Sequence, residues 1–62
     1  MNVIYETVTS SGQFTLCAEI EGFEHNCTID GYLALGLTVD QVRDLAEFGI
    51  KEAYDRFLSE QI

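Results

Sequence analysis

The chain of 62 residues is long enough for a single domain, residues 1–62, and too short for a second core or for the scaffold that most enzymes build around a pocket. Eleven acidic residues against three basic ones give a formal charge of −8, which argues against direct binding to nucleic acid or to an anionic membrane, because phosphates would be repelled. The hydrophobic fraction of 47% predicts a folded core, and any charged partner is expected to be basic.

Three β-strands are predicted in the first half of the chain. Residues 2–9 are rich in β-branched and aromatic side chains, and Ser-Ser-Gly at 10–12 supplies a turn. Residues 13–21 and 23–30 both alternate apolar and polar side chains with the period of two that is typical of a strand with one buried face. Together the three runs predict an antiparallel meander.

A two-residue turn at Glu21 and Gly22 would bring the apolar faces of the second and third strands together. It predicts four cross-strand pairs on that face, which are Ile20 with Phe23, Ala18 with His25, Leu16 with Cys27, and Phe14 with Ile29. On the other face, the same register places Glu19 opposite Glu24. In the first strand two alternating sets of side chains compete for the inner face, so its orientation is left open.

The remaining sequence predicts a connecting segment and a helix. Residues 31–36 are apolar and flanked by glycines, which fits either a short helical turn or an extension of the third strand. Thr38 is a predicted helix N-cap, with Gln41 as its capping-box partner. Apolar side chains then recur at helical spacing and predict one amphipathic helix over about 39–59.

Gly49 leaves one alternative open within this helix. It either lies inside the helix, for close packing on the sheet, or ends a first helix at Phe48. We favour one continuous helix. The predicted fold is therefore α+β, with a three-stranded antiparallel β-meander and one C-terminal amphipathic helix packed on one face, in the order β-β-β-α.

Charge is distributed unevenly along the chain. Residues 1–42 contain six acidic side chains and no Lys or Arg, whereas residues 43–62 contain five acidic and three basic ones. This imbalance predicts an acidic surface on the sheet that docks on a basic protein, or else a solvated face that serves solubility. The candidate target-binding carboxylates are Glu6, Glu19, Glu21, Glu24 and Asp30.

Phe48 is the sixth candidate for target binding. Helical spacing places it about 200° from the centre of the apolar stripe, among charged residues. An exposed aromatic side chain in such surroundings suits an interface anchor, although single exposed apolar residues are also common. Leu58 and Ile62 lie off the stripe as well, so a partner or a second copy could cover that side.

No catalytic, cofactor or metal site is predicted. His25 and Cys27 share one strand face at about 6.6 Å, too far apart for a nucleophile and its base. Cys17 and Cys27 fall on opposite faces and are expected to remain thiols in a reducing compartment. The N-terminus lacks a basic region followed by a long apolar run, which predicts a cytoplasmic location.

In size, acidity and β-sheet plus helix layout, the chain resembles the small acidic proteins by which phages and mobile elements block host defence or host nucleic-acid enzymes. These include anti-CRISPR, anti-restriction and uracil-DNA glycosylase inhibitor proteins, some of which are DNA mimics. The resemblance implies a non-enzymatic inhibitor that occupies a basic groove of a nuclease or of another nucleic-acid-binding complex. It assigns no role to individual residues, because these families share no common motif.

An alternative function is a structural or assembly module that forms a homodimer, with the acidity serving solubility alone. A core of this size is marginal without disulfides or metals, and dimerisation would relieve that. The first strand would offer an edge for it, because Val3, Ile4 and Tyr5 lack the charges that usually protect edge strands.

Overall fold

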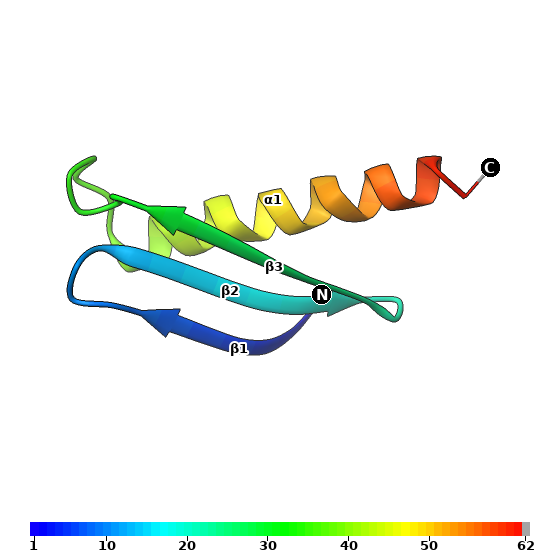
Figure 1. The fold of residues 1–62 in the computed structure, drawn as a ribbon, viewed down its shortest axis with the longest axis horizontal. Coiled ribbons are helices and arrows are strands. Elements are labelled where there is room, and N and C mark those ends of the chain that lie inside the picture. Colours follow the sequence, from blue (N-terminus) through cyan, green and yellow to red (C-terminus); the bar gives the residue numbers. More distant parts are fainter. Residues whose placement is uncertain (62) are drawn as a thin grey trace.

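The protein is a three-stranded antiparallel sheet with one long helix on one of its faces (Figure 1). The computed structural model describes residues 1–61. The elements are β1 (Asn2–Val8), β2 (Gln13–Ile20), β3 (Phe23–Asp30) and α1 (Val39–Ser59), and the strand order is β1-β2-β3. This arrangement confirms the predicted β-β-β-α fold. No helix within the described residues has the length and apolarity needed to cross a bilayer.

The β2–β3 hairpin has the register that the alternating pattern predicts. Ile20 lies opposite Phe23, and the pairing continues without a shift to Gln13 and Asp30. The turn between the strands consists of Glu21 and Gly22, which have φ angles of 52° and 83°. Positive φ at both central residues is the geometry of a type I′ turn, whose twist matches that of the strands.

A β-bulge in β1 explains why the orientation of this strand was ambiguous in the sequence. Val3 lies opposite Ala18 and Tyr5 lies opposite Cys17, so Ile4 is an extra residue without its own partner. The bulge reverses the alternation of side chains within the strand. As a result, each of the two competing patterns holds in one part of β1.

Helix α1 begins at the predicted cap and is continuous through Gly49. The Gln41 N–H donates to Thr38 Oγ1 at 3.2 Å, and the Thr38 N–H donates to Gln41 Oε1 at 2.9 Å, which completes the capping box. A methyl group on Gly49 would lie 3.0 Å from the sulfur of Cys27 on β3. The glycine therefore allows the close packing on the sheet that was predicted, and the alternative of a helix break is wrong.

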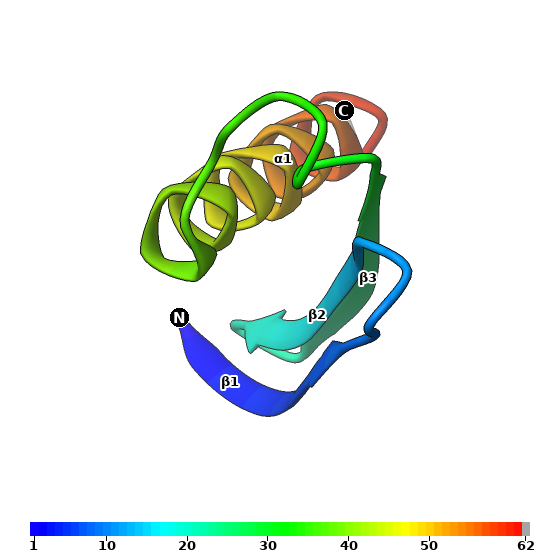
Figure 2. The same ribbon diagram turned by 90° about the vertical axis from the view of Figure 1, so that its left-hand side faces the viewer.

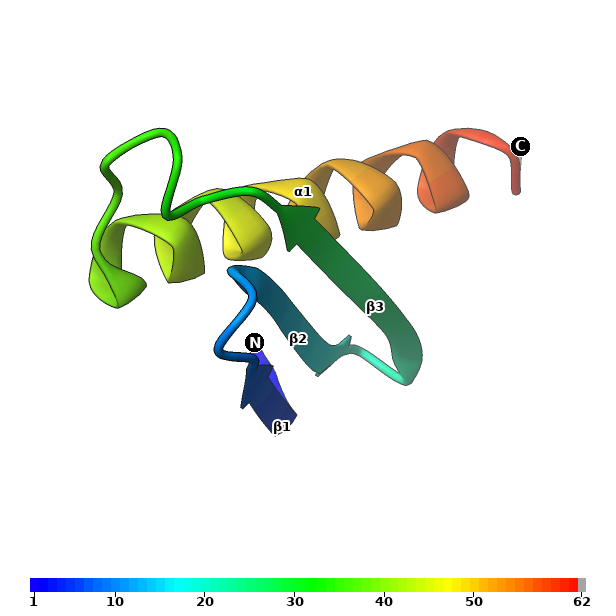
Figure 3. The same ribbon diagram turned by 60° about the vertical axis from the view of Figure 1, so that its left-hand side comes forward.

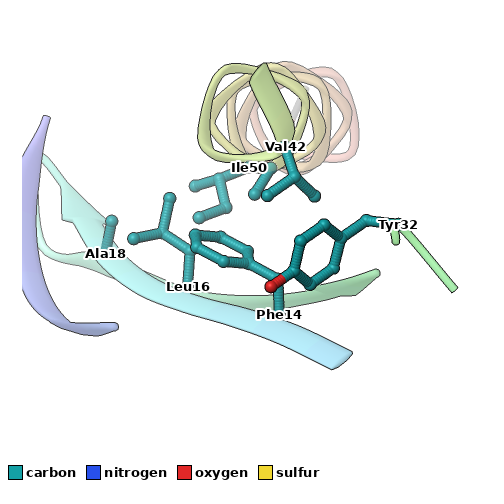
Figure 4. Packing of buried hydrophobic residues seen from close by; sticks show 7 residues of the cluster. Phe14, Leu16, Ala18, Tyr32, Val42 and Ile50 are labelled. Carbon is teal, nitrogen blue, oxygen red and sulfur yellow. The ribbon is translucent and has the colours of Figure 1, made fainter. Parts of the chain in front are cut away.

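The segment 31–36 forms consecutive turns and does not extend β3. The Leu35 N–H donates to the Tyr32 carbonyl at 3.2 Å, and the Gly36 N–H donates to the Leu33 carbonyl at 3.1 Å. These bonds span three residues and curl the chain from the sheet towards the start of α1. The side chain of Tyr32 enters the core, where its ring lies beside Phe14 (Figure 4).

The core lies between the helix and the inner face of the sheet, which we define as the face that carries Phe14, Leu16 and Ala18. It also contains Tyr32 from the turns and three residues of α1, namely Val42, Ala46 and Ile50. Helix α1 crosses the sheet obliquely (Figure 3) and packs on β2 and β3. In Figure 2 the sheet curls beneath the helix and β1 lies at its far rim, which leaves all seven residues of β1 exposed.

An aromatic cluster fills the space between the end of α1 and the β2–β3 turn. The ring of Phe23 stacks on Phe57 with 4.7 Å between the ring centroids and lies 5.8 Å from Tyr54. On β3 itself, Phe23 also stacks on His25, at 5.7 Å. These contacts hold the turn end of the sheet to the helix.

Candidate protein-docking surface

Three of the predicted carboxylates gather at the β2–β3 turn. Glu19 and Glu24 lie directly opposite each other on the outer face of the sheet, the face that α1 does not cover. Glu21 stands between them in the turn and is exposed. We call Glu19, Glu21 and Glu24 the turn carboxylates.

The positions of the turn carboxylates destabilise the fold. Like charges directly opposite each other on neighbouring strands are destabilising. Glu21 adopts a left-handed φ of 52°, which costs an L-residue on the order of 1 kcal/mol and is normally left to Gly, Asn or Asp. Within residues 1–61, both side-chain ion pairs involve Arg43, so neither of them neutralises a turn carboxylate.

A buried thiol lies beneath this surface, which the sequence pattern did not reveal. Cys17 is on the outer face of the central strand, yet it is almost completely buried. Its Sγ lies 3.7 Å from Oε1 of Glu24 and donates to that carboxylate. Burial, followed by the charge and the hydrogen bond of Glu24, raises the pKa of Cys17. The thiol therefore stays protonated near neutral pH and helps to position the carboxylate of Glu24.

Glu6 lies apart from the turn carboxylates, on the inner face. It pairs with Leu16, and its carboxylate receives two hydrogen bonds from Arg43 of α1, at 2.5 Å from Nε and 2.9 Å from Nη2. Arg43 Nη1 also donates to Asp40, at 2.8 Å. The hydrogen bond from Arg43 is the main reason that the pKa of Glu6 is lowered. Glu6 therefore connects β1 to the helix.

Asp30 shares the outer face with the turn carboxylates but lies at its opposite end. It follows Glu24 by six positions along the extended strand, a distance of about 20 Å. The side-chain amide of Gln13 donates to Asp30 at 2.8 Å. Its charge can therefore contribute to the field of the outer face, but not to the same contact as the turn carboxylates.

Phe48 is exposed, as its helical position predicts, with 61% of its surface accessible. Because α1 covers the inner face and Phe48 points away from the core stripe, it lies on the opposite side of the molecule from Glu19 and Glu24. A single flat partner surface cannot contact both. Leu58 is also exposed, whereas Ile62 lies outside the described residues.

Within residues 1–61, the other side chains that could act as nucleophiles, bases or metal ligands do not form a site. His25 and Cys27 share the inner face, as predicted, but both are only half-buried, and His25 stacks on Phe23. Burial raises the pKa of the Cys27 thiol. Across residues 1–61, no three His, Cys, Asp or Glu side chains come together in a group that could hold a metal ion.

No family model, curated protein or solved structure matches this chain.

Proposed function

We propose that the protein is a non-enzymatic inhibitor or binding protein that docks its turn carboxylates on a basic, nucleic-acid-binding protein, in the manner of phage counter-defence proteins. One observation carries this proposal: three carboxylates, none in an ion pair with the described cations, gather at one end of the sheet against charge repulsion and backbone preference. Features that cost stability and persist in a small domain are candidates for function.

The geometry suits a surface that normally binds phosphates. Directly paired residues on antiparallel strands have Cα atoms about 4.5–5.5 Å apart, so Glu19 and Glu24 present two carboxylates side by side. Arg binds carboxylate and phosphate with the same forked geometry, and a groove built for nucleic acid is rich in Arg and Lys. A cation placed between the two carboxylates would also remove their mutual repulsion.

Electrostatic steering should make association with a basic partner fast and sensitive to salt. A chain of charge −8 accelerates its encounter with a basic partner, and salt weakens this effect. A face that serves only solubility would show the same general attraction, but without dependence on particular carboxylates. Dependence of binding on particular carboxylates therefore distinguishes a docking surface from a face that serves only solubility.

The first test compares two double variants that remove the same charge. Glu19→Gln with Glu24→Gln alters the turn carboxylates, and Glu52→Gln with Asp55→Asn alters exposed positions on α1. With an arginine-rich peptide as probe at low salt, we expect the first pair to weaken binding by about tenfold, the effect of roughly 1.4 kcal/mol. The second pair should change it by less than about twofold. Equal losses for both pairs would contradict a localised docking surface.

A second test addresses the class of target. The immobilised protein is exposed to a bacterial lysate, and bound proteins are eluted with duplex DNA. We expect the wild-type protein to retain lysate proteins that duplex DNA then releases. The Glu19→Gln, Glu24→Gln variant should not retain these proteins. Identical capture by the two proteins, or no release by DNA, would contradict occupation of a nucleic-acid groove.

A further inference from the structure

The edge of β1 that faces away from β2 is one of the two edges of the sheet. β1 pairs with β2 along one edge, and its other edge is open. Four apolar side chains of this strand, Val3, Ile4, Tyr5 and Val8, are 44–49% exposed. Helix α1 packs on β2 and β3, and it reaches the inner face of β1 through the ion pair of Arg43 with Glu6, while Val3 and Val8 on that face stay exposed.

Backbone groups at this edge are available for pairing with another strand. Residues of a strand direct their N–H and C=O groups alternately to its two edges. The N–H of Thr9 donates to the carbonyl of Gln13 at 2.9 Å, so the backbone N–H and C=O groups of Thr9 and Thr7 point towards β2. Glu6 and Val8 therefore direct their backbone groups to the open edge, and the bulge at Ile4 ends this regular stretch.

A row of threonines crosses the outer face and ends at the same edge. Thr28 of β3 lies opposite Thr15 of β2, and their hydroxyl oxygens are 3.0 Å apart. Thr15 in turn lies opposite Thr7 of β1. Paired threonines stabilise neighbouring strands, and Thr7 has no such neighbour on its free side.

The charge near the open edge of β1 indicates which kind of partner can bind there. The only acidic residue of β1 is Glu6, and Arg43 neutralises it with a bidentate pair. A basic partner is attracted instead to the outer face, where the turn carboxylates lie. A second copy of this acidic chain is repelled by that face, so the neutral edge of β1 is where it can approach.

We propose that β1 pairs with β1 of a second copy in antiparallel orientation, centred on Thr7, to form a six-stranded sheet. In this register Glu6 lies opposite Val8 of the second copy, and the backbone groups that both residues direct outwards bond to each other. The threonine row then continues across the two-fold axis. A register centred on Glu6 would set two carboxylates opposite each other, which is unfavourable.

The dependence on salt concentration distinguishes this dimer interface from the proposed target binding. Two chains of charge −8 repel each other, and salt screens that repulsion, so dimerisation should strengthen as ionic strength rises. Binding of a basic partner should weaken under the same change. Failure of one proposal can therefore be recognised without reference to the other.

Analytical ultracentrifugation at low and high NaCl tests the dimer with two variants of equal charge change. Val8→Glu places a charge on the open edge, and Leu58→Glu places one at an equally exposed position near the end of α1, the exposed fractions being 44% and 45%. We expect wild type and Leu58→Glu to dimerise more at high salt and Val8→Glu to remain monomeric. A monomeric wild type at high salt, or equal dimerisation of the two variants, would overturn the proposal.

Cross-linking tests the register. At the two-fold axis the Cα atoms of the paired Thr7 residues would lie about 4.5 Å apart, which is within the range of a disulfide. We expect Thr7→Cys to give a covalent dimer under mild oxidation, and Thr28→Cys, which lies on the same face but on β3 at the opposite edge of the sheet, to remain monomeric. No dimer from Thr7→Cys, or equal yields from both variants, would contradict pairing centred on Thr7.

Discussion

Glu21 is the residue at which function and stability are expected to conflict most clearly. Its φ of 52° suits Asn better than Glu, so Glu21→Asn should stabilise the fold by about 0.5–1 kcal/mol. For a domain of this size, that corresponds to a rise of several degrees in Tm. Thermal unfolding measures the effect, and Glu21→Gln, which removes the charge without easing the backbone, serves as control. A Tm no higher for Asn than for Gln would contradict the assignment of strain to this turn.

Glu6 makes stability depend on pH in a defined direction. Its pKa is lowered from the ordinary value of 4.5, so the ion pair with Arg43 stabilises the fold above that pH and is lost as pH falls through the lowered pKa. Urea unfolding should therefore show Glu6→Gln to be less stable than wild type near pH 7, with the difference closing in acid. The loss should be modest, because the two side chains are 29% and 34% exposed.

Glu52→Gln is the control for this measurement, since Glu52 is an exposed side chain of α1. Its stability relative to wild type should not follow the same pH curve. A gap between Glu6→Gln and wild type that stays constant from neutral to acidic pH would show that the carboxylate charge of Glu6 does not stabilise the fold.

At the level of elements, α1 and β3 are coupled through Gly49. Replacing Gly by Ala inside a helix normally stabilises it by about 1 kcal/mol, but a methyl group here would press on the sulfur of Cys27. We expect Gly49→Ala to gain less than this in wild type and to recover the gain in combination with Cys27→Ala. Urea unfolding of the four proteins gives the coupling energy. Additive effects would contradict a close contact at this position.

The elements that were predictable from sequence are those with local, repeated signals. The alternation of β2 and β3 defined their register, because a shift of one residue would have mixed the apolar and polar faces. The capping residues Thr38 and Gln41 located the start of α1. The bulge at Ile4 left no comparable signal, since β1 is exposed on both faces and no buried pattern constrains it.

At the scale of the whole molecule, the sequence indicated how many carboxylates the sheet carries but not how they are distributed. Glu6 is brought to Arg43 by the packing of the helix, a contact between residues 37 positions apart in the chain. Phe48 and the turn carboxylates are separated by the layered architecture. Such relations depend on tertiary structure, whereas Glu19 and Glu24 could be paired from the hairpin register alone.

Whether the turn carboxylates form a localised docking surface can be measured directly. An NMR titration of the isotopically labelled protein with an arginine-rich peptide at low salt reports the contact residue by residue. We predict the largest amide shifts at Glu19, Glu21 and Glu24, and their loss at high salt. Shifts spread evenly over the acidic residues of the sheet and α1, or centred on α1, would contradict the central claim.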